Sequence, residues 1–322
     1  MKVADDTQSH SYIAQRIIDW LEGGDRSADA QELRETMDRL RFILVRDLTQ
    51  PRESRAGRES NTLYSGPCAR KSHLVFTGSQ KEPLRARTLL KFLLGDLVEA
   101  TILAMAKLAG CPITDNNIDL SITGHDGKQV PVHPDGLYQA PDGTLFNIEI
   151  KSCDSGTFDR WDRENGPDDT WGYLTQGSVE CQAWREYGKQ VDGTLFLAVS
   201  TGSRIGSIAE YYKPFDPALV EAWHCRRYEA MRGLPSIPFA STPELVFRRG
   251  KALDPATDFT HGDPQPRTNE KGIYGYDIPS GRQVVPLICS YCDFRALHCW
   301  RSATLEMDNG KPVWVVPAEV PA

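Results

Sequence analysis

The sequence has no run of about 18 apolar residues, the length that a membrane-spanning helix needs. The segment from Met1 to Thr7 also lacks the apolar stretch of a secretory signal. We therefore expect a cytoplasmic protein in a reducing compartment, without a membrane partner. No internal repeat is visible, so a solenoid or a repeat array is not indicated.

Closely spaced cysteines are also scarce. Eight cysteines in 322 residues do not indicate a disulfide framework, because such frameworks belong to small secreted domains. Four of the eight have no partner at a short spacing, and we expect them to be small buried side chains. These are Cys111, Cys153, Cys181 and Cys225.

Positive charge is in the minority, since the formal net charge is −7. This balance argues against nucleic-acid binding by the whole surface. Residues 34–91, however, contain thirteen Lys and Arg against six Asp and Glu, which gives this segment +7 and the rest −14. Such a segment can hold phosphates while the remainder keeps the protein soluble. An ordinary helix surface followed by an Arg-rich loop is the alternative.

Hydrophobic periodicity predicts an α/β protein with a mixed central sheet flanked by helices. Residues 50–62 and 233–285 are rich in breakers or polar residues and are expected to be irregular. Helices are expected over 8–48 with a break at Gly23-Gly24, and over 83–108, 170–188 and 217–232. Strands are expected near 117–123, 129–138, 144–151, 194–200 and 207–213.

The most informative stretch is a predicted β-hairpin formed by residues 132–138 and 146–151. Asp135 is expected on its first strand, and Glu149 and Lys151 on its second. Since alternate residues of a strand share a face, the Glu149 and Lys151 side chains should lie together. Carboxylates placed so closely repel each other unless a cation joins them, and Mg²⁺ or Mn²⁺ prefers such oxygen ligands. A lysine beside the metal can orient or deprotonate water, which suits metal-assisted phosphodiester hydrolysis. A solvated hairpin with a surface salt bridge is the alternative.

Two polar residues on predicted helices are candidates to join this site. Glu99 lies in the middle of the long helix among apolar neighbours, and a buried carboxylate needs a partner, a metal or a proton. Gln176 lies on the helix after the hairpin and can hydrogen-bond water or a phosphate oxygen. The alternatives are that Glu99 faces solvent on the exposed stripe of its helix and that Gln176 is a surface residue.

Pro134-Asp135 followed by Glu149-Ile150-Lys151 resembles the motif of the PD-(D/E)XK nuclease superfamily. Gly95 to Glu99 resembles the Gly-x-x-x-(Glu/His) helix motif of its RecB-like members, and Gln176 matches their glutamine. Glu180 stands where these nucleases usually have a tyrosine, which leaves that tyrosine's role open. The resemblance implies a restriction-endonuclease-like core in which Glu99, Asp135, Glu149 and the Ile150 carbonyl bind Mg²⁺ or Mn²⁺. It implies further that Lys151 orients the attacking water and that Gln176 positions water or phosphate.

Near the C-terminal end, Cys289, Cys292 and Cys299 form a Cys-x2-Cys-x6-Cys pattern. Thiolates at this spacing can surround one soft metal centre, which needs a fourth ligand. Zinc, with His298 as a possible ligand, and bare core thiols are the alternatives. RecB-like iron–sulfur nucleases carry one cysteine before the core, often as Cys-x-Arg, and three after it. Cys68-Ala69-Arg70 resembles the first part, so the resemblance implies a [4Fe–4S] cluster on Cys68, Cys289, Cys292 and Cys299.

The sequence thus predicts a metal-dependent DNA exonuclease of the RecB-like iron–sulfur type, acting on single strands or ends. Its expected parts are a helical region (1–60), a nuclease core (61–240) and a tail with the cysteines (241–322). The alternatives are a catalytically degenerate DNA-binding or assembly subunit and a CRISPR spacer-processing endonuclease. A helicase or recombination partner and an oligomer are compatible with either reading. Candidate phosphate contacts are Arg70, Arg85 and Arg87.

Overall fold

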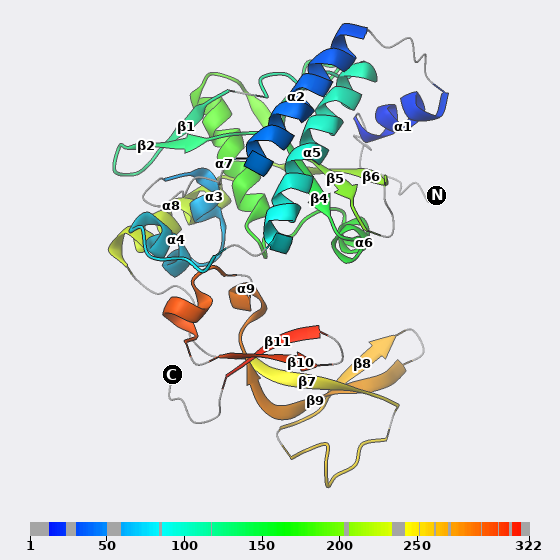
Figure 1. The fold of residues 1–322 in the computed structure, drawn as a ribbon, viewed down its shortest axis with the longest axis vertical. Coiled ribbons are helices and arrows are strands. Elements are labelled where there is room, and N and C mark those ends of the chain that lie inside the picture. Colours follow the sequence, from blue (N-terminus) through cyan, green and yellow to red (C-terminus); the bar gives the residue numbers. More distant parts are fainter. Residues whose placement is uncertain are drawn as a thin grey trace. The chain divides into compact units, whose positions relative to one another are not determined.

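The computed structural model describes most of the chain as two compact units. One unit comprises Met1–Gly78 with Leu84–Ser236, and the other comprises Ser79–Pro83 with Ile237–Ala322. The described residues are 13–23, 30–49, 59–83, 86–116, 118–202, 206–233, 242–250, 252–260, 262–269, 272–290, 292–301, 303–308 and 311–316. Figure 1 shows the helices and strands of both units.

The larger unit is built on a four-stranded mixed sheet in the order β3-β4-β5-β6. Strand β4 pairs antiparallel with β3 and parallel with β5, and β6 returns antiparallel to β5. A parallel neighbour requires a crossover, and two helices, α6 and α7, form it between β4 and β5. The prediction of a mixed sheet flanked by helices is confirmed. The bounds are β3 (Gly136–Gln139), β4 (Leu145–Cys153), α6 (Ser155–Glu164), α7 (Tyr173–Glu186), β5 (Val191–Ser200) and β6 (Ile208–Pro214).

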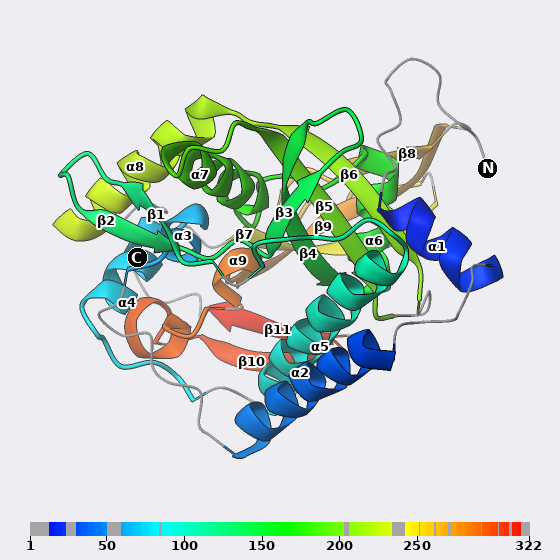
Figure 2. The ribbon, with the colours of Figure 1, turned by 90° about the horizontal axis from the view of Figure 1, so that it is seen from above.

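Helices cover both faces of this sheet (Figure 2). On β4, Phe146, Ile148 and Ile150 join the apolar cluster of helix α5 (Ala86–Leu108). The alternate residues, including Asn147 and Glu149, hydrogen-bond to side chains of α7. Because both faces of β4 are covered, its polar residues are held in a largely dry environment and need protein partners.

The N-terminal segment forms two helices, as the periodicity predicts. Helix α1 (Ala14–Gly23) ends at the first glycine of the predicted break, and α2 (Ala30–Thr49) packs along α5. Glu210 on β6 accepts hydrogen bonds from the Ile13 and Ala14 backbone nitrogens, at 2.8 and 3.1 Å. These bonds satisfy donors that a helix leaves unpaired at its start. The predicted loop over 50–62 lies mostly outside the described residues.

The predicted strand over residues 129–138 is in fact two strands in two sheets. Strand β2 (Gln129–Val132) pairs with β1 (Leu120–Thr123) in a small separate sheet, whereas β3 begins at Gly136. The chain leaves β2 after Val132, and His133, Pro134 and Asp135 separate it from β3. A Cβ at Gly136 would lie 2.3 Å from Cγ2 of Ile113, so only glycine fits there. Asp135 therefore stands just before its strand rather than on it.

Helices α8 and α3 pack beside α7, and α4 packs against α8 and α3. Helix α8 (Pro217–Arg232) has the predicted bounds, because Asp216 caps its start and Gly233 ends it in a left-handed conformation. Helices α3 (Asn61–Ser65) and α4 (Ala69–Phe76) are too short to show a clear apolar period, so their sequences do not predict them. Helix α6 was not predicted either, although Asp154 caps it and accepts a hydrogen bond from the Thr157 nitrogen.

The smaller unit contains a second sheet, and the expectation of irregular structure over 233–285 is wrong. Its order is β10-β11-β9-β7, with β8 also paired to β9. Many residues of these strands are exposed, so they lack the apolar alternation that marks a half-buried strand. The bounds are β7 (Thr242–Arg249), β8 (Gln265–Asn269), β9 (Gly272–Val284), β10 (Thr304–Asp308) and β11 (Lys311–Val316), with α9 (Leu287–Ser290) and a π-helical turn η1 (Arg295–Cys299).

Residues 79–83 belong to this smaller unit although they come early in the chain. The Glu82 backbone nitrogen donates to the Asp293 carbonyl oxygen at 2.7 Å, and the Glu82 carboxylate pairs with Arg295 at 2.9 Å. His298 lies 2.9 Å from the Gln80 carbonyl oxygen. None of the helices in the described ranges has both the length and the apolar character of a membrane span.

Candidate active site

The candidate site is centred on Glu149, which is only 1% exposed on the central strand β4. Its Oε1 atom forms an ion pair with the ammonium group of Lys151, two residues along the same strand. The same oxygen accepts a hydrogen bond of 2.9 Å from the Gln176 side chain on α7. The two-residue spacing predicts this shared face, and the helix after the hairpin supplies the third group.

The second oxygen of Glu149 has a different environment. Oε2 is buried and has no hydrogen-bond partner among the described atoms. A buried carboxylate oxygen without a partner is costly, because water no longer compensates its charge. This atom is therefore the place in the site where a cation or a water would be most strongly stabilised.

Asp135 is fixed against the same strand from the neighbouring turn. Its Oδ2 atom accepts a hydrogen bond of 2.7 Å from the Ile150 backbone nitrogen, between Glu149 and Lys151. Burial, and then the charges of Glu149 and Glu99, raise the pKa of Asp135 well above its usual range, while Lys151 opposes the shift. The charges of Glu149 and Glu99 therefore disfavour the ionised form of Asp135.

Glu99 has a protein partner that no local sequence pattern predicts. It lies on α5, and its side chain is 33% exposed. Arg39 of α2 donates to its Oε1 atom at 3.2 Å. Burial raises the pKa of Glu99, Arg39 lowers it, and Asp96 and Glu149 raise it further. Glu99 therefore lies between the two predicted environments: partly buried, and paired with an arginine.

Lys151 is held as an ammonium ion. Burial alone would lower its pKa, but the charges of Glu149 and Asp135 outweigh burial and raise it. Its Nζ atom also lies 5.2 Å from the centroid of the Tyr173 ring, a cation–π distance. Lys151 therefore acts as a donor and a positive charge in this arrangement.

One face of α7 carries most of the polar groups that support the site. Tyr173, Gln176, Glu180 and Trp184 follow one another at three- and four-residue spacing, which places them in one row on a helix. Gln176 donates to Glu180 as well as to Glu149, and Trp184 donates to Asn147 of β4. Of this row, only Gln176 was predicted to be functional from the sequence, and the same spacing is the signal that marks Tyr173 and Trp184.

The donor chemistry of Glu99, Asp135 and Glu149 suits a hard divalent cation. The unpartnered Glu149 oxygen supports this fit. Within the part of the chain that the structure describes, however, no three His, Cys, Asp or Glu side chains are gathered closely enough to form a metal-ligand group. Lys151 lies on the Glu149 carboxylate and balances its charge in this arrangement.

The four cysteines of the predicted cluster are half-buried and form no disulfide. Cys68 stands at the start of α4, where its sulfur accepts a hydrogen bond from the Lys71 nitrogen at 3.4 Å. Cys289 lies on α9, Cys299 ends η1, and the Cys292 nitrogen donates to the Cys289 carbonyl oxygen at 3.0 Å. Among the described residues, the structure does not gather three of these sulfurs into one metal-ligand group, so the cluster stays a prediction.

Of the other four cysteines, three are buried as predicted and one is exposed. Cys111, Cys153 and Cys181 are at most 3% exposed, as expected. Cys225 is exposed on α8, where its thiol donates to Glu221. It lies at a surface position of the helix, so the expectation that it is buried is wrong.

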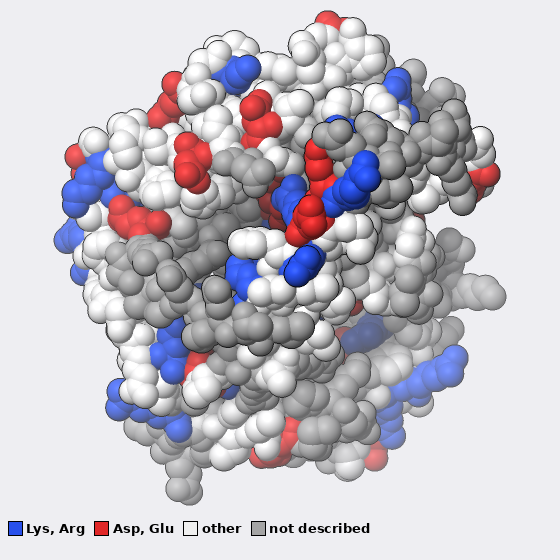
Figure 3. All heavy atoms as spheres, turned by 45° about the horizontal axis from the view of Figure 1, so that its top comes forward, with Lys and Arg blue, Asp and Glu red and all other residues white. Residues whose placement is uncertain are grey.

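The predicted phosphate contacts are only partly described. Arg70 lies half-buried on α4. Arg85 lies outside the described residues, and so does the side chain of Arg87 on α5. On the face drawn in Figure 3, the described acidic and basic side chains are intermixed. This view therefore adds no support for a continuous basic surface.

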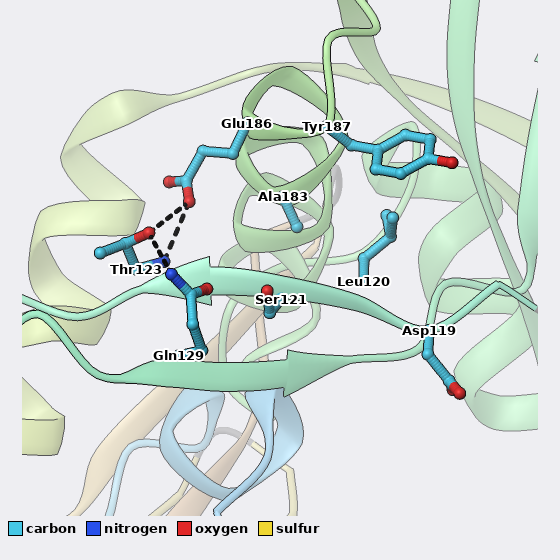
Figure 4. A pocket seen from close by; sticks show the side chains of 8 residues that line it. All are labelled: Asp119, Leu120, Ser121, Thr123, Gln129, Ala183, Glu186 and Tyr187. Carbon is cyan, nitrogen blue, oxygen red and sulfur yellow. Dashed lines mark hydrogen bonds between the residues drawn. The ribbon is translucent and has the colours of Figure 1, made fainter.

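An open groove of about 530 Å³ lies between the β1–β2 hairpin and the end of α7 (Figure 4). Glu186 on its rim accepts hydrogen bonds from the Thr123 nitrogen and hydroxyl, both at 3.0 Å. None of the predicted site residues lines it. The lining residues are Asp119, Leu120, Ser121, Thr123, Gln129, Ala183, Glu186 and Tyr187.

Comparisons with known proteins give little further guidance. No protein-family profile matches the chain, and no curated protein matches it. Among solved structures, the chain is similar to one described as "Crystal structure of SSO0001". The likeness has a TM-score of 0.36 and 14% identity, and it covers 62% of this chain and 86% of the other. A likeness this weak carries no argument about function.

Proposed function

We propose that this chain is a metal-dependent DNA nuclease related to the PD-(D/E)XK superfamily, with an exonuclease acting on single strands or ends as the favoured form. The observation that carries the proposal is the Glu149 carboxylate. It holds Lys151 and Gln176 on one oxygen and keeps the other buried without a partner. Asp135 is fixed to the same strand by the Ile150 nitrogen.

Each polar group of the site has its own role in phosphodiester hydrolysis. Lys151 donates hydrogen bonds and positive charge to the attacking water or to the phosphate oxygens, where negative charge develops. Gln176 restrains Glu149 and contributes its amide to water or phosphate. A bound Mg²⁺ or Mn²⁺, held by Glu99, Asp135, Glu149 and the Ile150 carbonyl oxygen, would activate water and offset phosphate charge. Arg39 forms an ion pair with Glu99, so Glu99 would have to leave this arginine to bind the metal ion.

We propose a [4Fe–4S] cluster on Cys68, Cys289, Cys292 and Cys299, with zinc as the alternative. Such a centre would join the start of α4 to the α9–η1 segment across more than 200 residues, and closing so long a loop restricts the unfolded chain. Its role would be structural, since the carboxylates carry the chemistry. Iron and zinc analysis of the purified protein separates the two metals.

A second candidate is a catalytically inactive DNA-binding or assembly subunit. The observation that favours it is Glu180, a buried acid at the position where RecB-like nucleases usually have a tyrosine. Intact Asp135, Glu149 and Lys151 favour the enzyme. A CRISPR spacer-processing endonuclease would use the same residues. The form of DNA that the protein cuts therefore has to distinguish the exonuclease from the endonuclease.

The deciding experiment is digestion of end-labelled single- and double-stranded DNA, and of circular DNA, with Mg²⁺ and with Mn²⁺. We expect single nucleotides or short products from linear substrates and slower loss of circles. Glu149→Ala and Lys151→Ala should each abolish cleavage while the colour of the cluster persists. Near-normal turnover in both variants would refute the site, and DNA binding without cleavage by the wild type would favour the inactive subunit.

A further inference from the structure

A chain of buried hydrogen bonds leads from Trp184 to the Gln176 amide. The Trp184 indole nitrogen lies 3.1 Å from Oδ1 of Asn147, and Nδ2 of Asn147 lies 2.9 Å from Oε2 of Glu180. The other Glu180 oxygen, Oε1, lies 2.9 Å from Nε2 of Gln176. Trp184, Asn147 and Glu180 are at most 1% exposed, so bulk water does not replace these partners.

Trp184 sets the direction of these hydrogen bonds. An indole N–H only donates, so Asn147 must turn its carbonyl oxygen toward the indole and its NH₂ group toward Glu180. Asn61 supplies another donor, because its Nδ2 lies 3.3 Å from Oε1 of Glu180 while its Oδ1 accepts from Ser65 at 2.8 Å. Both oxygens of Glu180 therefore face donors. A carboxylate meets this requirement, and a neutral amide does not.

These hydrogen bonds fix the orientation of the Gln176 side-chain amide. Its Nε2 atom lies 2.9 Å from Oε1 of Glu180 and 2.9 Å from Oε1 of Glu149. The two protons of the NH₂ group are thus used by two carboxylates on either side. The amide carbonyl oxygen must then point away from both, as a hydrogen-bond acceptor in a fixed direction.

We propose that Glu180 is a positioning residue, which holds Gln176 so that its carbonyl oxygen accepts a hydrogen bond from the attacking water beside Glu149. This inference rests on the proposed nuclease function and deepens it. Such a hydrogen bond restrains the orientation of the water before attack. Glu180 itself touches neither water nor substrate, and it acts through Gln176.

The test uses Glu180→Gln in the full chain. The substitution changes little in volume but places an NH₂ group against Asn61, Gln176 or Asn147, which are themselves donors. We expect kcat on single-stranded DNA to fall by roughly 10- to 100-fold, with the KM for DNA within about twofold of wild type. Glu180→Asp, which keeps two acceptor oxygens, should recover part of the loss. Glu186→Gln, on the exposed side of the same helix, should retain wild-type kcat.

A second readout does not depend on turnover. Calorimetric titration with Mn²⁺ should show weaker binding to Glu180→Gln than to wild type or Glu186→Gln, because Glu149 loses the restraint of Gln176. Gln176→Met removes the amide without touching Glu180, and it should lower kcat by a similar factor. If Glu180→Gln does not fold, a normal kcat in Gln176→Met still overturns the inference.

The outcomes separate this inference from the proposed function. A wild type that cuts DNA, with kcat and Mn²⁺ affinity unchanged in Glu180→Gln, overturns the inference and leaves the nuclease proposal standing. Lower thermal stability of Glu180→Gln with unchanged kcat indicates a purely structural role and also overturns it. A wild type that neither binds Mn²⁺ nor cuts DNA removes the nuclease proposal, and the inference with it.

Discussion

The Oδ2 atom of Asp135 accepts a hydrogen bond of 2.7 Å from the Ile150 backbone nitrogen. This bond ties the turn before β3 to the middle of β4, next to Glu149 in the chain. Since burial and the charges of Glu149 and Glu99 raise the pKa of Asp135, its ionised form destabilises the fold when no cation is bound.

Asp135→Asn should therefore stabilise the protein while it inactivates it. Asparagine can still accept from the Ile150 nitrogen, but the negative charge is lost. Without divalent ions, we expect a higher denaturation midpoint than wild type at neutral pH. The difference should vanish below about pH 4, where the carboxyl is protonated in both the folded and the unfolded state. Nuclease activity should fall by more than about 100-fold. A lower midpoint at neutral pH would contradict the proposed repulsion.

The Glu149–Lys151 ion pair predicts non-additive effects on stability. Lys151→Met leaves Glu149 buried without its counter-charge and should lower the free energy of unfolding by about 3 kcal/mol. Glu149→Gln in the same chain removes the charge that lost its partner, so the double variant should be more stable than Lys151→Met alone. Denaturant unfolding of the wild type, both single variants and the double variant measures the coupling. Additive losses would mean that the pair is not energetically coupled.

The cysteine set predicts a metal-dependent fold. Cys292→Ala should give colourless protein that is insoluble or easily proteolysed, because one ligand of the proposed cluster is missing. Cys225→Ala is the matched control, since this cysteine is exposed on α8, and it should retain colour and solubility. Absorption spectra and iron analysis of both variants test the prediction. Wild-type protein that contains zinc and no iron would overturn the iron–sulfur assignment.

Helix α7 carries Gln176 and begins after a close backbone approach at Gly172. This glycine has φ of +80°, and a Cβ there would lie 2.1 Å from the Ser65 carbonyl oxygen. Gly172→Ala should lower the free energy of unfolding by roughly 3 kcal/mol or more, from the clash and the left-handed conformation together. Gly188→Ala has positive φ with open space around it, so it should cost only about 1–2 kcal/mol. Equal losses in thermal or denaturant unfolding would contradict the contact.

Acid stability should depend on Asp126. Its hydrogen bond with Arg227 lowers the pKa of Asp126 to about 2. A lowered pKa stabilises the fold above the usual aspartate pKa, near 4, and this contribution is lost as the pH falls toward 2. Asp126→Asn should therefore be less stable than wild type at pH 6 and equal to it near pH 2. Unfolding at several pH values tests this, and a constant difference would exclude the ion pair as its source.

Sequence periodicity predicts the core of the larger unit well. The long helix α5, the strands β4 and β5 and the helices α7 and α8 all lie close to their expected bounds, because their apolar residues face one dense core. The shared face of Glu149 and Lys151 follows from strand geometry alone. These are local rules, and they apply within single elements.

What the sequence could not supply depends on contacts between distant segments. Arg39 reaches Glu99 across 60 residues, and Asn61 reaches Glu180 across 119. No local pattern marks such pairs. The break between β2 and β3 depends on a close approach of Gly136 to Ile113. The strands of the smaller unit were missed because they are largely exposed, and the breakers among them mark turns as well as irregular chain.

The segment Ser79–Pro83 has a consequence for how the protein can be divided. The smaller unit is not formed by one continuous segment. Its Arg295 and His298 side chains contact Glu82 and Gln80, which precede them by more than 200 residues. A fragment that begins after Ser236 would lack this early piece, and one that ends there would leave Glu82 without Arg295. Exchange of the C-terminal part between homologous chains must therefore carry residues 79–83 along with it.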